Sequence, residues 1–263
     1  MKTGETKIWD ATSGERLLTL FIPGYSGRDK RWSVPAWSPD GTRIATGYDY
    51  GAFVNIWDAT SGEELMTVRG FTHERSETFW VEWSPSGDRI LTVDEKEFVK
   101  VWDATTGEKV LDISDFENVV PIADWSPDGS RIATLTYEND GAIWDAQSGG
   151  KLAEFYGHQG STFGLRWSPS GERLVTGSYD GTVRVWDADS GQQVLHYPIG
   201  YKINKVDWSH DGSKLLITYA DSIIVLPVWQ TTQELIDYAH ECCVVRDLTP
   251  EDRELYGLPP EEE

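Results

Sequence analysis

The stretch from Ser161 to Gln192 reads STFGLRWSPSGERLVTGSYDGTVRVWDADSGQ and decides the fold. Three apolar runs alternate in it with three tight turns, Ser-Pro-Ser-Gly (168–171), Tyr-Asp-Gly (179–181) and Asp-Ala-Asp-Ser-Gly (187–191). Short alternating runs bounded by Gly, Pro, Asp and Ser are typical of strands joined by hairpins. A fourth run, Val194 to Tyr197, follows the last turn. The segment therefore predicts one four-stranded antiparallel sheet.

Two series of tryptophans indicate that this unit recurs along the chain. The first series has spacings of 48, 45, 42, 42 and 43 residues and consists of Trp9, Trp57, Trp102, Trp144, Trp186 and Trp229. Its first five members are each followed by Asp. The second series has spacings of 46, 42, 42 and 41 residues and consists of Trp37, Trp83, Trp125, Trp167 and Trp208. A period near 42 residues with two tryptophans in fixed phase indicates tandem repeats.

These motifs resemble those of the WD-repeat β-propeller family. Each second-series tryptophan begins a W-S-P-[DS]-G motif, except that His210 replaces the proline after Trp208, and Gly157-His158 matches the family's G-H. The resemblance covers about residues 4–230 and implies an all-β propeller of four-stranded antiparallel blades. In such a fold the repeat tryptophans fill the space between blades. The chain also resembles, loosely, the C-terminal WD-repeat region of larger bacterial signalling proteins.

The repeats predict a propeller over residues 1–230 and a helical, acidic C-terminal tail over 231–263, where a Thr cap candidate precedes apolar positions. Complete units are expected at 32–69, 78–113, 120–156 and 162–198, and partial units at 1–22 and 203–229. The 21 expected strands match neither five four-stranded blades nor six. Either the N-terminal pair completes the last blade and displaces the strand at 222–229, or the missing strands come from an upstream segment or another subunit. We favour the second alternative.

The composition restricts the partners and the compartment. With 44 acidic and 23 basic residues the net charge is −21, which disfavours binding of nucleic acid or an anionic membrane. We see no 18-residue apolar run and expect no secretory leader. The two cysteines, Cys242 and Cys243, are adjacent and provide no disulfide framework. We therefore expect a cytoplasmic protein.

One constellation imitates a catalytic triad. The resemblance implies that His158, Ser178 (or Thr176), Asp180 and Trp186 form a hydrogen-bonded network within one blade. Such a network satisfies buried polar groups and activates none of them. The other histidines share no metal-ligand spacing, and no hydrolase or phosphate-binding motif occurs. We expect no enzyme activity, no cofactor and no metal.

Comparison of the internal copies predicts the binding face. The turns between strands one and two, and between strands three and four, barely change and share one rim, whereas the loops of the opposite rim differ in every copy. Variable loops on a rigid scaffold favour recognition. We call this opposite side the variable rim and predict partner binding there. The candidate residues are aromatic or cationic and comprise Tyr25, Arg28, Lys30, Arg31, Trp32, Tyr48, Tyr50, Phe71, His73, Arg75 and Trp80.

The sequence therefore predicts a non-catalytic scaffold that binds a peptide, a protein partner or an upstream domain, with association through the unclosed edges as a further expectation. Two other classes remain open, because the fold alone does not establish function. One is an enzyme or metal site in the central channel, built from Glu82, Asp124 and Asp207, although Arg166 and Ala36 interrupt that ring. The other is a propeller that binds carbohydrate or a small ligand through exposed aromatic residues.

Overall fold

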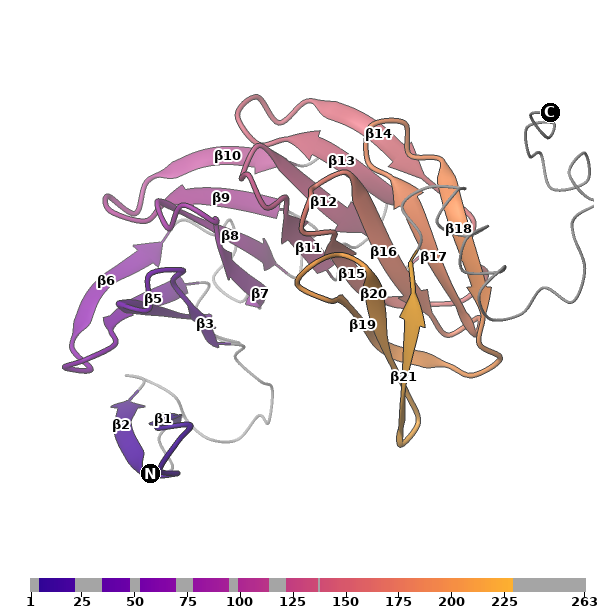
Figure 1. Ribbon diagram of the computed structural model, residues 1–263. Coiled ribbons are helices and arrows are strands. Elements are labelled where there is room, and N and C mark those ends of the chain that lie inside the picture. Colours follow the sequence, from indigo (N-terminus) through magenta and orange to yellow (C-terminus); the bar gives the residue numbers. More distant parts are fainter. Residues whose placement is uncertain are drawn as a thin grey trace, which may run out of the picture.

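The computed structural model describes residues 5–21, 35–47, 53–69, 78–94, 99–113, 122–136 and 138–228. Every regular element in these ranges is a β-strand, which confirms the predicted all-β class. The strands form six antiparallel sheets that follow one another around an arc in chain order (Figure 1). In the same ranges no helix is long and apolar enough to cross a membrane. The predicted C-terminal tail lies outside the described residues, as do both cysteines.

Four of the sheets have four strands each, as expected for propeller blades. The first contains β3 (Pro35–Trp37), β4 (Arg43–Gly47), β5 (Phe53–Asp58) and β6 (Glu64–Arg69). The second contains β7 (Thr78–Trp83), β8 (Arg89–Asp94), β9 (Val99–Asp103) and β10 (Lys109–Ile113). The third contains β11 (Ile122–Trp125), β12 (Arg131–Leu135), β13 (Gly141–Asp145) and β14 (Lys151–Phe155). The fourth contains β15 (Thr162–Trp167), β16 (Arg173–Ser178), β17 (Thr182–Asp187) and β18 (Gln193–Pro198).

Two smaller sheets lie at the ends of the arc. β1 (Glu5–Trp9) pairs with β2 (Arg16–Phe21), and β19 (Ile203–Trp208), β20 (Lys214–Tyr219) and β21 (Ser222–Pro227) form a three-stranded sheet. β21 pairs with β20 along its whole length, from Ser222 opposite Tyr219 to Pro227 opposite Lys214. The N-terminal pair therefore does not displace this strand in the described part of the chain. The first of the two closure alternatives is not the arrangement observed.

Two features recur in the sheets. The inner strands carry buried apolar residues, and the tight turns contain glycine. Along β16 the residues from Leu174 to Ser178 are all buried, as expected for a strand enclosed on both faces. The Ser-Pro-Ser-Gly turn before it ends at Gly171, which adopts φ 74°. Only glycine takes up this left-handed conformation without strain. The turn thus returns the chain at once into the next strand.

The first tryptophan series is anchored by a repeated hydrogen bond. In all four complete sheets the indole Nε1 of the W-D tryptophan donates to the hydroxyl of a threonine on the neighbouring strand. The pairs are Trp57–Thr46 at 2.8 Å, Trp102–Thr92 at 2.9 Å, Trp144–Thr134 at 2.8 Å and Trp186–Thr176 at 2.8 Å. Each of these indoles is at most 4% exposed, so the bond satisfies a donor that water does not reach.

The expectation that every repeat tryptophan fills space between blades is wrong for the first member of each series. Trp9 is 57% exposed and Trp37 is 51% exposed, whereas Trp83, Trp125 and Trp167 are at most 6% exposed. Trp9 lies on β1, whose only described partner is β2, and Trp37 lies on β3 beside a two-stranded sheet. Among the described residues, neither has the neighbouring strand that covers the later copies.

The last sheet also departs from the predicted register. Leu226 lies opposite Leu215, the position that Trp186 occupies opposite Leu174 in the preceding sheet. Trp229, which the spacing placed in this role, lies outside the described residues. Ile217 stands where the other sheets have the threonine acceptor, so this position offers no hydroxyl to an indole. An apolar pair therefore replaces the tryptophan–threonine bond.

Candidate functional site

The variable rim is well defined in the sheet β15–β18. Tyr179 donates its backbone N–H to the carbonyl of Ser161 at 2.9 Å, and Ile199 donates to the carbonyl of Gly181 at 2.9 Å. These bonds join the start of β15, the turn between β16 and β17 and the segment after β18. The uniform Ser-Pro-x-Gly and W-D turns are bonded to one another at the opposite ends of the strands. The two classes of turn therefore occupy opposite rims.

A group of aromatic side chains lies on this rim. The rings of Phe163 and Tyr179 are 4.5 Å apart, those of Tyr201 and Tyr219 stack at 5.2 Å, and the Lys202 amine lies 5.1 Å from the Tyr179 ring. We call these five residues the aromatic patch. Phe163, Tyr179 and Tyr201 are 39%, 40% and 62% exposed. Exposed tyrosines beside a cation are typical of protein-binding surfaces.

A cavity of about 260 Å³ opens beside the patch on the inner strands of the arc. We call it the inner-wall pocket; its lining consists of Trp80, Ile122, Phe163, Gly164, Leu165, Arg166, Asn204, Lys205 and Val206. These residues come from the first strands of four successive sheets. The guanidinium of Arg166 lies 5.7 Å from the Trp80 ring. The pocket thus combines aromatic walls with cationic and amide groups.

Two buried carboxyl groups lie behind Arg166. Burial raises the pKa of Glu82 well above its ordinary value, the nearby Asp124 carboxylate raises it further, and Arg166 opposes the shift. Burial also raises the pKa of Asp124, to about 6, although the positive charge of Arg166 lowers it. Arg166 Nη1 lies 3.9 Å from Asp124 Oδ2. Asp124 is the more readily ionised of the two because it also accepts the backbone N–H of Trp167 at 3.1 Å. Near neutral pH Glu82 is therefore protonated and Asp124 is ionised. The Asp124 carboxylate is then the negative partner of the Arg166 guanidinium.

Asp207, the third carboxylate considered, accepts a hydrogen bond from the backbone N–H of Trp208 at 2.9 Å. Within the described residues no group of three or more His, Cys, Asp or Glu side chains is placed to hold a metal ion. Arg166 is the cation that acts on Glu82 and Asp124, and Asp207 is a further carboxylate that acts on Asp124. In the described ranges no serine, threonine or cysteine side chain is bonded to Glu82 or Asp124. The cluster neutralises buried charge.

The triad-like constellation forms a chain of hydrogen bonds. His158 Nε2 lies 2.8 Å from Thr176 Oγ1, and His158 Nδ1 lies 2.9 Å from Asp180 Oδ2. Burial lowers the pKa of His158, so the ring is neutral at pH 7 and donates Nδ1–H to Asp180. It therefore accepts the Thr176 hydroxyl proton at Nε2, and Thr176 accepts from Trp186. Every donor in this chain has an acceptor, which leaves no free nucleophile.

Asp180 serves as the acceptor at the end of this chain. Burial raises the pKa of Asp180, but hydrogen bonds from Thr182, Gln159 and His158 outweigh that effect and hold the pKa well below its ordinary value. Ser178, the first-named alternative for the hydroxyl, instead donates to the carbonyl of Gly160 at 2.6 Å. Thr176 is the residue that connects His158 with Trp186. The network therefore ties the loop before β15 to the turn after β16.

Of the predicted partner-binding residues, only Trp80 lies in the described ranges, where it is half-buried and lines the inner-wall pocket. Those outside the described residues are Tyr25, Arg28, Lys30, Arg31, Trp32, Tyr48, Tyr50, Phe71, His73 and Arg75. Sequence reasoning missed Phe163, Tyr179, Tyr201 and Tyr219. Each lies in a variable loop or within two residues of one, so an inventory of aromatic residues by rim would have found them.

The comparisons with known proteins agree with the repeat structure. The family model described as WD domain, G-beta repeat, matches residues 25–58 and 149–187. The second match runs from just before β14 to the end of β17, so it combines the last strand of one sheet with three strands of the next. No curated protein matches the chain. Repeats of this kind generally mediate protein–protein interaction and are typically non-catalytic. The two matches and the recurring four-stranded antiparallel sheets together support a WD-repeat family for this chain.

Proposed function

We propose that the chain is a non-catalytic scaffold that binds a peptide or protein partner on its variable rim. The observation that carries the proposal is the inner-wall pocket beside the aromatic patch, which share Phe163. A partner side chain would enter the pocket between Trp80 and Phe163, and the exposed tyrosines would cover the flanking segment. Aromatic residues supply large contact area at a small cost in side-chain entropy. Arg28, Lys30 and Arg31, which we call the cationic loop, were predicted from the sequence to belong to the variable rim and lie outside the described residues.

The experiment compares capture of partners by the full chain and by matched variants. Phe163→Ser with Tyr179→Ser should weaken capture at least about tenfold, because two contacting aromatic anchors are removed. Replacement of Arg28, Lys30 and Arg31 with Ala tests the cationic loop in the same way. The control is Leu152→Ser, since Leu152 is 53% exposed on β14 at the outer side of its sheet. Melting temperatures should stay nearly unchanged in all variants.

Two outcomes would contradict this assignment. Capture that survives loss of both the aromatic patch and the cationic loop would place the binding face elsewhere. Equal loss in the Leu152 control would indicate a general effect of surface polarity. We further propose a cytoplasmic location. We also propose that chains associate through the edges of β1 and β21, and the mass in solution over a concentration series would test this association.

A further inference from the structure

The uniform rim carries a bridge between neighbouring sheets that is built from arginine. Arg43 donates Nη2 to the carbonyl of Gly87 at 2.7 Å and Nη1 to the carbonyl of Ala104 at 3.2 Å, both in the next sheet. Its guanidinium also lies 4.6 Å from the Trp83 ring. The arginine thus joins its own sheet to a Ser-Pro-x-Gly turn, a W-D turn and an indole of the next sheet. We call such a boundary between two adjacent sheets a seam.

The same bridge recurs two sheets further along. Arg131 donates Nη2 to Gly171 at 2.6 Å and Nη1 to Ala188 at 3.4 Å, and it lies 4.8 Å from the Trp167 ring. Arg131 also pairs with the carboxylate of Asp189 at 2.8 Å. In a complete bridge, therefore, the arginine donates to two carbonyls of the next sheet and lies against its tryptophan ring.

The seam between them, where β7–β10 meets β11–β14, is incomplete. Arg89 donates Nη1 to the carbonyl of Ala146 at 3.1 Å, but among the described residues its guanidinium has no second acceptor. The equivalent carbonyl, that of Gly129, accepts no hydrogen bond from these residues either. The buried Nε1 of Trp125 is also without a partner there, although Trp83 and Trp167 each donate to a carbonyl of the preceding sheet.

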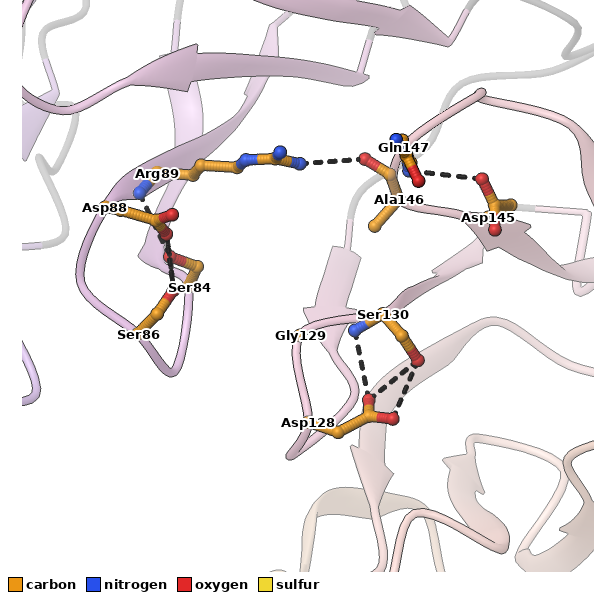
Figure 2. A pocket seen from close by; sticks show the side chains of 10 residues that line it. All are labelled: Ser84, Ser86, Asp88, Arg89, Asp128, Gly129, Ser130, Asp145, Ala146 and Gln147. Carbon is orange, nitrogen blue, oxygen red and sulfur yellow. Dashed lines mark hydrogen bonds between the residues drawn. The ribbon is translucent and has the colours of Figure 1, made fainter.

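A cavity of about 400 Å³ occupies this position. Figure 2 shows Arg89 extended toward Ala146, with the turn from Asp128 to Ser130 lying apart from the guanidinium. We call the cavity the seam notch; its lining consists of Ser84, Ser86, Asp88, Arg89, Asp128, Gly129, Ser130, Asp145, Ala146 and Gln147. A donor on one wall and a free carbonyl on the other therefore face a space large enough for a short segment of chain.

The chemistry of the walls selects the occupant. A group that fits between Arg89 and Gly129 must accept a hydrogen bond on one side and donate one on the other. A peptide group does both, with its C=O toward Arg89 and its N–H toward the Gly129 carbonyl. We propose that the seam notch binds an extended, basic polypeptide segment across the uniform rim. This site lies on the rim opposite the aromatic patch and does not depend on the function proposed for that patch.

The charge around the notch accounts for the basic character of the segment. Hydrogen bonds from Ser126 and Ser130 lower the pKa of Asp128 to about 2, and bonds from Ser86 and Ser148 lower the pKa values of Asp88 and Asp145. All three carboxylates are thus ionised at neutral pH; Arg89 is the one cation in the lining, and Arg131 acts on Asp128 from outside it. The net charge of −21 on the whole chain acts in the same direction. Lysine or arginine side chains flanking the bound peptide group would meet these carboxylates.

The first experiment uses a capped peptide of alternating alanine and lysine as the probe, added to the ¹⁵N-labelled full chain. We expect saturable shifts of the backbone amide resonances of Gly129, Ser130 and Gln147, with little change at the equivalent Gly171 and Asp189. A capped alanine–glutamate peptide should produce no shift. Shifts of equal size at both seams would indicate nonspecific attraction by the acidic rim and would overturn the proposal, as would the absence of shifts.

The second experiment closes the notch with a single substitution. Gln147 occupies the position that Asp189 occupies beside Arg131, so Gln147→Asp offers Arg89 an internal carboxylate partner. It should weaken binding of the alanine–lysine peptide at least about tenfold, although it adds a negative charge. The matched control, Thr105→Asp, adds the same charge beside the completed Arg43 bridge and should leave affinity within about twofold of wild type.

A fold check accompanies both variants. Gln147→Asp should keep or raise the melting temperature, because Arg89 gains a partner. Peptide binding by a folded Gln147→Asp chain at wild-type affinity would refute the role of Arg89. Equal weakening in Thr105→Asp would show that the effect is not local to the notch. In either case the proposed site would have to be abandoned, whereas the variable rim would be unaffected.

Discussion

The indole nitrogen of Trp186 lies 2.8 Å from the hydroxyl oxygen of Thr176, and both side chains are almost completely buried. Trp144 and Thr134 make the same bond at 2.8 Å in the preceding sheet. The difference between the sheets is His158, which lies 2.8 Å from Thr176 Oγ1 and extends the bond into a chain that reaches Asp180. The two threonines therefore allow the contribution of the histidine to be measured.

We expect Thr176→Val to destabilise the protein by about 1–3 kcal/mol, since a buried indole donor and the imidazole both lose their partner. Thr134→Val removes the acceptor of Trp144 and the long hydrogen bond, 3.4 Å, from Thr134 to the carbonyl of Ala142, but it leaves no imidazole unpaired and should cost less. The free energies of unfolding from urea titration of the two variants make the comparison. Equal losses would mean that His158 adds nothing to the stability of its sheet.

The pair Glu82–Asp124 predicts a dependence of stability on pH. Since burial raises both pKa values, the folded protein retains protons that the unfolded chain has released at pH above about 4. The contribution of Glu82 and Asp124 to the free energy of unfolding therefore falls as the pH rises from about 4 through about 6, where Asp124 ionises. It falls further as Glu82 ionises. Glu82→Gln removes one of these groups. The variant should melt above wild type at about pH 8, by about 2–4 °C for each kcal/mol recovered, with a smaller difference at about pH 5.

Melting curves of wild type and Glu82→Gln across this range test the direction. The control is Glu15→Gln, because Glu15 is exposed in the hairpin between β1 and β2. A difference that grows as the pH falls would contradict the assignment of raised pKa values. A loss of stability at every pH would show that the Glu82 carboxyl makes a favourable contact that glutamine cannot replace.

The arginine bridges predict unequal costs for the same substitution. Arg131→Ala removes three hydrogen bonds that the guanidinium donates and its contact with the Trp167 ring. We therefore expect the free energy of unfolding to fall by about 1–3 kcal/mol. Arg89→Ala removes one bond and should cost less than about 1 kcal/mol. Urea titrations of both variants measure the difference. A larger loss from Arg89→Ala would mean that the middle seam is not the weaker one.

The exposed tryptophans predict the accessibility of the indole fluorescence. Trp9 and Trp37 are more than half exposed, whereas Trp102 and Trp144 are at most 2% exposed. Trp37→Phe should therefore reduce the fraction of emission that iodide quenches, and Trp102→Phe should leave that fraction unchanged or raise it. Steady-state quenching curves suffice for the measurement. Unchanged quenching after substitution of both Trp9 and Trp37 would indicate that another structure covers them in solution.

Much of the fold could be predicted because repetition supplies its own alignment. The W-D and W-S-P-x-G spacings predicted recurring four-stranded antiparallel sheets, and four such sheets are observed in chain order. The spacing was wrong at Trp229, because Leu226 occupies the position in the strand register that the tryptophan spacing assigned to Trp229. The loss of the threonine acceptor at Ile217 was visible in the sequence and pointed to an apolar neighbour.

The candidate sites were harder to predict, because they depend on contacts between repeats. Arg43, Arg89 and Arg131 begin the second strand of their sheets, and although Ser86 and Asp88 differ from their counterparts, these differences do not predict which arginine lacks a second acceptor. The difference is seen only in the packing of two sheets, where a cavity lies between Arg89 and the turn that contains Gly129. The pairing of Phe163 with Tyr179 likewise brings together two loops of one rim. Residue type indicated an interaction surface, and geometry was needed to locate it.

Five clusters of buried side chains hold the arc together, and each is shared by two adjacent sheets; the outermost joins Ile8 and Leu20 to Ile44 and Trp57. The molecule is in this respect a linear series of links, each stabilised by its nearest neighbours. Loss of structure on heating should accordingly travel inward from whichever terminal link is weaker, so that amide protons near the middle of the series exchange last.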